Sequence, residues 1–285
     1  MSNADLWTAL LFVPGDDRHK IEKAAALNAD AIILDLEDGV ALNRKAEARV
    51  CIHAALSELS FGRSARIVRI NSLDSPFWRD DLASLLQPPL PDAIMLPKAT
   101  SAAQIAELSG TAPPLPLIPI IESGRGLIHI AEIAAQPGLS ALAFGAEDYT
   151  ADIGAARTAG GDEVLMARSM VVLHAKVNGL AAFDTPYIDL HDLDGLRTDA
   201  RKAQTLGFTG KLAIHPRQLP VLHEVFMPTT EETDRARRLI VAYETGQAQG
   251  SGVLAFEGRM VDAPMVRAAL TILARARGAE PTQRF

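Results

Sequence analysis

Residues 31–38 read Ala-Ile-Ile-Leu-Asp-Leu-Glu-Asp, an apolar run that leads into three carboxylates. Its apolar residues are consecutive rather than alternating, which is typical of a strand buried on both faces of a parallel sheet. Runs of similar character recur along the chain and predict eight short strands in all. They cover residues 9–13, 31–36, 65–70, 93–96, 115–121, 141–144, 181–183 and 211–214.

Stretches with helical spacing lie between several of these runs, at residues 20–27, 44–59, 127–135 and 163–177. Strand–helix alternation repeated about eight times predicts a parallel sheet with right-handed crossovers. Eight units favour a closed (β/α)8 TIM barrel, which needs about 250 residues, and we place it at residues 1–226. The alternative is a doubly wound open sheet, but Val13-Pro14-Gly15-Asp16 lacks the Gly-rich loop that such a sheet usually carries after its first strand.

A different pattern follows the eighth predicted strand. Residues 229–247 have the character of a helix, with two threonines at its start and Glu231 and Glu232 in its first turn. A Gly-rich link at 250–252 leads to the segment 257–262 and to a last helix that ends near residue 277. Since a barrel does not need this part, residues 227–285 are expected to form a C-terminal helical extension that caps the barrel or reaches a neighbouring subunit.

The composition is that of a globular protein, with 48% hydrophobic and 22% charged residues. A net charge of −7 and scattered basic residues argue against a general nucleic-acid binder. No apolar run reaches the roughly 18 residues that span a bilayer, and the N-terminus does not resemble a signal peptide. Cys51 is the only cysteine, which excludes an internal disulfide. A cytoplasmic protein that does not bind membranes is therefore expected.

Ionisable residues follow the predicted strands at their carboxyl ends. In barrel enzymes these ends surround one mouth, where the active site is built. The sequence therefore predicts an enzyme. The residues are Asp16 to Arg18, Asp35, Glu37, Asp38, Arg69, Lys98, Glu122, Asp148, Asp184 and His215.

Carboxylates outnumber cations in this predicted ring. Glu122 and Asp148 would share the mouth with the cluster at 35–38, and like charges at short range raise one another's pKa. A hard divalent cation relieves this repulsion, and carboxylates without a His or Cys cluster suit Mg²⁺ or Mn²⁺. Glu122 and Asp148 are thus candidate metal ligands.

Seven segments at the predicted strand ends resemble the citrate lyase β-subunit, malyl-CoA lyase and citramalyl-CoA lyase family of the HpcH/HpaI aldolase superfamily. They occur in the family's order and span residues 8 to about 226. The tail segment Gly258-Arg259-Met260-Val261-Asp262 extends the resemblance to nearly the whole chain. The seven are Leu11-Phe12-Val13-Pro14-Gly15, Ile33-Leu34-Asp35-Leu36-Glu37-Asp38, Val68-Arg69-Ile70-Asn71, Leu96-Pro97-Lys98, Ile120-Ile121-Glu122-Ser123, Phe144-Gly145-Ala146-Glu147-Asp148 and Lys211-Leu212-Ala213-Ile214-His215-Pro216.

The resemblance implies a role for each matching residue. Glu122 and Asp148 match the family's Mg²⁺ ligands, through which they would also bind the substrate. Arg69 matches the arginine that pairs with the substrate, where a planar guanidinium suits a carboxylate or a developing oxyanion. Asp262 matches the catalytic aspartate that a neighbouring subunit supplies for proton transfer at the acyl thioester. The resemblance therefore implies a homo-oligomer, a trimer or a dimer of trimers.

Coenzyme A would carry the substrate, and Arg18, Lys20, Lys23 and His215 are candidate contacts to it. The first loop departs from a common family form, because Asp17 and Arg18 stand where an Arg-Pro pair is usual. This departure weakens the assignment of particular phosphate contacts to this loop. His215 has a second interpretation, since it precedes Pro216 and can simply shape a loop.

Other candidates have structural interpretations as well. The acids at 35–38 can cap the next helix or contact a metal through water, and Lys98 can neutralise its acidic neighbours. Asp184 is expected to be a hydrogen-bond acceptor at a strand end.

The activity that the resemblance implies is Mg²⁺-dependent carbon–carbon cleavage. A 3-hydroxyacyl thioester of the citryl-, citramalyl- or malyl-CoA type would yield a 2-oxo acid and a short acyl thioester. A metal aldolase acting on free hydroxy acids is an alternative, as is the β-subunit of a citrate lyase complex that uses acyl-carrier-protein thioesters. A scaffold without activity is disfavoured because all four expected site residues are present: Arg69, Glu122, Asp148 and Asp262.

Overall fold

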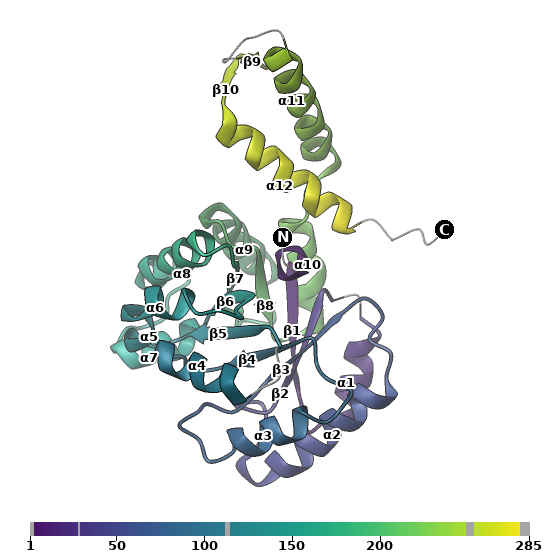
Figure 1. Cartoon of the computed structure of the whole chain (residues 1–285), viewed down its shortest axis with the longest axis vertical. Helices are drawn as coiled ribbons and strands as arrows, with labels where there is room; N and C mark the ends of the chain where they lie inside the picture. The colour runs from purple at the N-terminus through teal and green to yellow at the C-terminus, as the bar shows by residue number, and fades with distance from the viewer. Residues whose placement is uncertain (1–2, 28, 112–114, 249–253, 280–285) are drawn as a thin grey trace. The chain divides into compact units, whose positions relative to one another are not determined.

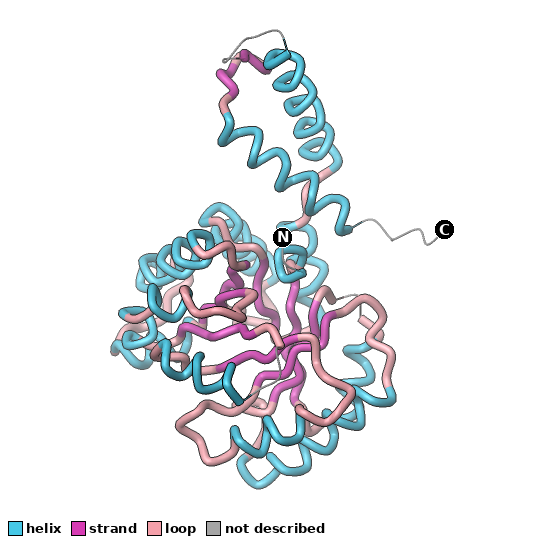
Figure 2. The backbone as a smooth tube through the Cα atoms, in the orientation of Figure 1, coloured by secondary structure: helices cyan, strands magenta, loops and turns pink. Residues whose placement is uncertain are grey.

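The computed structural model describes residues 3–27, 29–111, 115–248 and 254–279. The chain divides into two compact units, Met1–Glu224 and Val225–Phe285. The first unit holds a ring of strands with helices around it, as Figures 1 and 2 show.

Eight parallel strands form a closed barrel in which each strand pairs with the next and β8 pairs with β1. The predicted TIM barrel is therefore confirmed, and every predicted strand is found within two residues of its expected ends. The strands are β1 Ala9–Pro14, β2 Ala31–Asp35, β3 Ala65–Arg69, β4 Ala93–Leu96, β5 Leu117–Ile121, β6 Ala141–Phe144, β7 Ala181–Asp184 and β8 Gly210–Ala213.

Alternate residues of the strands fill the barrel interior, because successive side chains of a strand point to opposite faces. Leu10, Ile33, Met95 and Phe183 belong to this core and are at most 2% exposed. Their sequence neighbours on each strand point outward to the helices. Burial on both sides explains why the strands are nearly continuous in apolar residues.

Helices alternate with the strands. The expected helix at 127–135 is instead two helices that break at His129, and the sequence did not reveal this because apolar spacing continues through Leu127, Ile130 and Ile133. The helices are α1 Arg18–Ala25, α2 Lys45–Glu58, α3 Trp78–Leu85, α4 Ala102–Thr111, α5 Gly124–Ile128, α6 Ile130–Ala134, α7 Ala146–Ile153, α8 Leu165–Val177, α9 Leu193–Leu206 and α10 Leu219–Phe226, with 3-10 turns η1 Asn3–Leu6, η2 Leu42–Arg44, η3 Asp162–Val164 and η4 Pro216–Gln218.

The second unit contains α11 Thr230–Ala248 and α12 Ala263–Ala279, which pack around a small apolar core of Ala236, Leu239 and Val261. An antiparallel hairpin, β9 Leu254–Phe256 and β10 Arg259–Val261, lies between the two helices. We expected only helices here, and strands of three residues are too short to show a periodic pattern. The Gly-rich link at 250–252 lies outside the described residues. Among the described helices, none is long and apolar enough to cross a membrane.

Candidate functional site

A pocket of about 130 Å³ lies at the carboxyl ends of the strands, and Arg69, Glu122 and Asp148 all line it. Arg69 ends β3, Glu122 follows β5, and Asp148 lies in the first turn of α7 rather than directly at a strand end. The rest of the lining is mostly apolar. It consists of Phe12, Ile120, Phe144, Gly145, Ala146, Glu147, Thr185, Pro186 and Leu212.

Glu122 is held on the pocket wall by backbone geometry. It is 5% exposed, and its Oε1 accepts a hydrogen bond of 2.6 Å from the backbone N–H of Lys98. Gly145 makes room for it, because a Cβ at position 145 would lie 2.5 Å from Glu122 Oε2 and 2.7 Å from Glu122 Cβ. Any larger residue at 145 would displace this carboxylate.

The pKa of Glu122 is raised to about 8, mainly by burial and also by the nearby carboxylates of Glu37 and Asp148, which together outweigh the opposing effects of the Lys98 N–H and Arg69. Without a cation, this carboxyl group therefore holds a proton at neutral pH. The predicted surplus of negative charge at the mouth is present in the structure.

Arg69 is anchored by two acids. Its Nε and Nη2 donate to the two carboxylate oxygens of Asp35, at 2.7 and 2.6 Å, and its Nη1 lies 2.9 Å from Glu37 Oε2. The guanidinium also lies over the ring of Phe12, 4.7 Å from its centroid. A guanidinium fixed in this way presents one orientation to the pocket.

Lys98 joins two of the acids. Its backbone has φ of 52°, in the left-handed region, and from there its N–H reaches Glu122. Its ammonium donates to Glu37 Oε1 at 2.6 Å and lies 3.7 Å from Asp38 Oδ1. The interpretation that Lys98 neutralises acidic neighbours therefore fits the structure.

Asp35 acts on its own backbone as well as on Arg69. Its carboxylate accepts from the N–H groups of Glu37 and Gly39, at 2.9 and 2.8 Å. These contacts fix the loop after β2, which favours the structural interpretation of this acid.

Asp184 also has a structural environment. It is fully buried between the barrel and the outer helices, where it pairs with Arg168 of α8 and Lys211 of β8. Asp199 of α9 completes this network through Arg168 and Lys211. The sequence did not reveal Arg168 or Asp199 as partners, because nothing local links residues so far apart in the chain.

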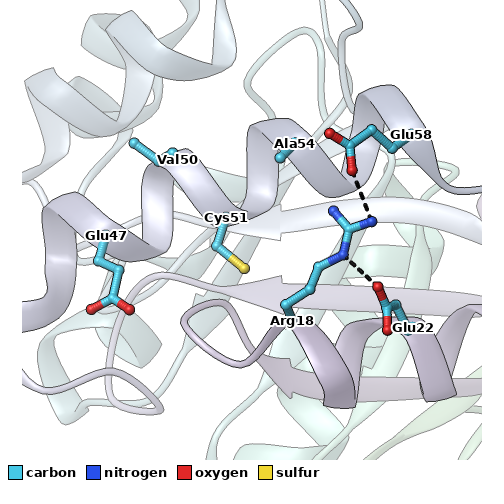
Figure 3. Close-up of a pocket in the computed structure, with 7 residues that line it drawn as sticks. All are labelled: Arg18, Glu22, Glu47, Val50, Cys51, Ala54 and Glu58. Atoms are coloured by element: carbon cyan, nitrogen blue, oxygen red, sulfur yellow. Dashed lines mark hydrogen bonds and ion pairs between the residues drawn. The ribbon is translucent and has the colours of Figure 1, made fainter.

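The candidate coenzyme A contacts lie in two parts of the barrel: Arg18, Lys20 and Lys23 in α1, and His215 after β8. Arg18 lies in a hollow between α1 and α2, where it pairs with Glu22 at 2.8 Å and Glu58 at 3.0 Å (Figure 3). Lys20 pairs with Asp17 at 3.1 Å, and Lys23 is exposed.

His215 shapes a turn, as its second interpretation expected. Its Nδ1 accepts from the backbone N–H of Arg217 at 3.1 Å, and it forms a capping box with Gln218 at the start of η4. Contact of His215 and of the three basic residues with coenzyme A stays a prediction.

Asp262 lies in the second unit, between β10 and α12, and is exposed. Its Oδ1 accepts from the N–H of Met265 at 3.3 Å, so that it caps α12. Its role in proton transfer stays a prediction.

The donors in the pocket suit a hard divalent cation. Mg²⁺ commonly takes one or two carboxylates from a protein and completes its octahedron with water or substrate oxygens. Glu122 and Asp148 meet this pattern, and a cation between them would offset the repulsion that raises the pKa of Glu122. Among the described residues there is no cluster of three or more His, Cys, Asp or Glu side chains that could hold a metal.

The raised pKa predicts a pH dependence of the metal-free protein. Because the folded state holds the Glu122 proton more tightly than an unfolded chain with pKa 4.5, this group contributes stability that is present below 4.5 and lost as pH rises through about 8. Urea titrations in the presence of chelator should show that the free energy of unfolding of the wild type falls relative to that of Glu122→Gln between about pH 5 and pH 9. Equal pH profiles for the two proteins would contradict the assignment.

Comparison with known proteins gives three findings. A family model described as HpcH/HpaI aldolase/citrate lyase matches residues 8–216. The mitochondrial citramalyl-CoA lyase of Rattus norvegicus is 39% identical, over 94% of this chain and 85% of that protein, and a (3S)-malyl-CoA thioesterase of Cereibacter sphaeroides is 34% identical, over 94% of both. The crystal structure of protein CitE from Mycobacterium tuberculosis in complex with magnesium, acetoacetate and coenzyme A has a TM-score of 0.82 and 37% identity, over 96% of this chain and 99% of that one.

Proposed function

Because this chain belongs to the HpcH/HpaI aldolase/citrate lyase family, as its sequence motifs indicated, we propose that it is a Mg²⁺-dependent carbon–carbon lyase. Its substrate is a 3-hydroxyacyl thioester of coenzyme A, of the citramalyl, malyl or citryl type. The products are a 2-oxo acid and a short acyl thioester.

One observation carries the proposal. The buried carboxylate of Glu122 faces the same pocket as Asp148, beside an arginine that two acids hold in place. A 2-oxo acid needs a cation for its paired oxygens and a planar donor for its carboxylate, and these three side chains supply both. The CitE structure, with magnesium, acetoacetate and coenzyme A bound, supports this interpretation.

Each residue has a defined task in cleavage. Glu122 and Asp148 would hold Mg²⁺, which when bound would supply Lewis-acid stabilisation of the negative charge that develops on the substrate. Arg69 hydrogen-bonds the oxygen on which negative charge develops, while Asp35 and Glu37 keep its guanidinium in place. The apolar side chains of Phe12, Ile120 and Leu212 line the same pocket and lower the polarity around the breaking bond.

Asp262, supplied by a neighbouring subunit of a homo-oligomer, completes the reaction. In cleavage the substrate hydroxyl loses its proton to solvent as its oxygen becomes the carbonyl of the 2-oxo acid, and the electron pair of the broken carbon–carbon bond remains on the acyl thioester as an enolate. The carboxyl group of Asp262 protonates the enolate carbon and then regains a proton from solvent. In the condensation direction the carboxylate removes that proton again.

The proposal is tested by following two products at once. Citramalyl-, malyl- and citryl-CoA are incubated with the protein, with Mg²⁺ or with chelator, and both 2-oxo acid and free coenzyme A thiol are measured. A lyase releases 2-oxo acid without free thiol and stops in chelator. Release of thiol without 2-oxo acid would identify a thioesterase. Cleavage of free hydroxy acids alone would favour the metal aldolase, and cleavage of carrier-protein thioesters alone would favour the citrate lyase β-subunit.

Replacing Asp262 by asparagine is expected to lower kcat by about 10²-fold or more, since general acid–base groups typically contribute 10²–10⁴-fold. Asparagine still caps a helix, so α12 and Mg²⁺ affinity should be unchanged. Steady-state kinetics and calorimetry measure the two quantities, with Asp234→Asn in α11 as a matched control. Normal turnover in Asp262→Asn would exclude the proton-transfer role.

Mixing subunits tests whether neighbouring chains share a site. Asp262→Asn and Glu122→Ala proteins are each expected to be inactive, but mixed oligomers should regain activity if one chain supplies Asp262 to the other's pocket. No recovery after verified subunit exchange would place each site within one chain.

A further inference from the structure

Helix α7, which carries Asp148 in its first turn, has no cap of its own. The first N–H groups of a helix lack partners within the helix, and a side chain at the N-cap usually satisfies one of them. Here the N-cap is Gly145, which has no side chain and makes no cap hydrogen bond. A larger residue cannot stand there, because Glu122 occupies the space.

The missing cap comes from another strand. Thr185, the residue after β7, is 2% exposed, and its Oγ1 accepts a hydrogen bond of 3.0 Å from the N–H of Ala146, the first residue of α7. Thr185 and Asp148 line the same pocket. The hydroxyl therefore fixes the turn of helix from which Asp148 projects.

Thr185 is itself held in place by the buried charges behind it. Asp184, its neighbour in sequence, accepts from Arg168 at 3.0 and 2.7 Å and from Lys211 at 2.5 Å, and all three side chains are at most 1% exposed. A strand end that is fixed by three charge-assisted hydrogen bonds gives the following hydroxyl little freedom to move.

We propose that Thr185 is a positioning residue for the cation site, which holds Asp148 in register with Glu122 by capping α7 from β7. The inference rests on the proposed role of Asp148 as a Mg²⁺ ligand. Thr185 acts through the helix, since its Oγ1 accepts from the N–H of Ala146 in the first turn of α7.

The test compares isosteric and conservative variants. Thr185→Val removes the hydroxyl at nearly constant volume and should weaken Mg²⁺ binding about tenfold, as expected when a group that orients a metal ligand is lost. Thr185→Ser keeps the acceptor and should bind Mg²⁺ within about twofold of wild type. At saturating Mg²⁺ the kcat of Thr185→Val should recover to within about threefold, because only the affinity is impaired.

Thr209→Val is the matched control. Thr209 is 1% exposed, and its Oγ1 accepts from the N–H of Ala182 at 3.1 Å, near the opposite end of β7, and from Nζ of Lys176 at 3.0 Å. This variant should lose at least as much thermal stability as Thr185→Val, because it removes two hydrogen bonds, but it should keep wild-type Mg²⁺ affinity.

Calorimetric titration of Mg²⁺ into the full-length variants decides the outcome. Asp148→Asn is expected to abolish Mg²⁺ binding. If it does, then wild-type Mg²⁺ affinity in Thr185→Val would overturn the positioning role. An equal loss of Mg²⁺ affinity in Thr185→Val and Thr185→Ser would overturn it as well. If Asp148→Asn itself binds Mg²⁺ normally, then the proposed metal site fails and the inference fails with it.

Discussion

Glu122→Gln is expected to lower kcat/KM by about 10³-fold and to remove measurable Mg²⁺ binding, since Lewis-acid stabilisation supplies several kcal/mol and each 1.36 kcal/mol is tenfold in rate. Glutamine preserves the shape that fits beside Gly145 and can still accept from the Lys98 N–H. It removes only the negative charge, so that the loss of activity reports the charge and not the packing.

Glu147→Gln is the matched control for this change. Glu147 lines the same pocket and is next to Asp148, but its carboxylate pairs with Arg157 at 2.8 Å and is 46% exposed. Its substitution should change kcat/KM by less than about threefold, because an exposed pair contributes little. The two variants are compared by steady-state kinetics and by calorimetric titration of Mg²⁺, and comparable losses in both would show that the pocket responds to any loss of negative charge.

Lys211→Met is expected to destabilise the barrel by about 3–5 kcal/mol, the usual cost of breaking a buried ion pair from one side. Lys211 is fully buried, and its ammonium lies 2.5 Å from both Asp184 and Asp199. Methionine fills a similar volume but leaves two carboxylates to share the guanidinium of Arg168. Urea unfolding followed by circular dichroism measures the change.

Two further variants separate buried charge from lost packing. Lys202→Met, in α9, removes a pair of 3.9 Å with the exposed carboxylate of Asp162 and a hydrogen bond of 2.7 Å to the backbone oxygen of Gly160, and should cost about 1 kcal/mol. Adding Asp199→Asn to Lys211→Met removes the excess negative charge and should restore part of the stability. If Lys211→Met is no more destabilising than Lys202→Met, the network does not behave as a buried ion cluster.

The strands and the pocket acids could be predicted from the sequence because their signals are local. A strand buried on both faces is a run of apolar residues, and in a barrel the residue after such a run must be at the mouth. From these two rules alone, the positions of Arg69 and Glu122 at the ends of apolar runs predict that both side chains lie at one pocket. Asp148 was found for a related reason, although it lies within a helix that starts just after its strand.

What the sequence did not reveal depends on contacts between distant segments. Thr185 caps a helix that begins 39 positions earlier in the chain. Arg168 of α8 pairs with Asp184 at the end of β7 and with Asp199 of α9. No spacing rule links such pairs. The break at His129 and the hairpin after α11 were missed for a different reason, since each is too short to disturb a periodic pattern.

The lack of a side chain at position 145 also bears on how relatives of this protein can be judged. A sequence that keeps the arginine and every acid of the mouth, but carries alanine or a bulkier residue at this position, would have no room for the carboxylate that Glu122 presents here. Such a homologue would be expected to fold into the same barrel and retain the full set of charged motifs. Its side chain at this position would nevertheless push the carboxylate out of the place that Glu122 occupies here. A residue larger than glycine at this position of a related sequence therefore predicts a displaced carboxylate and a weakened cation site.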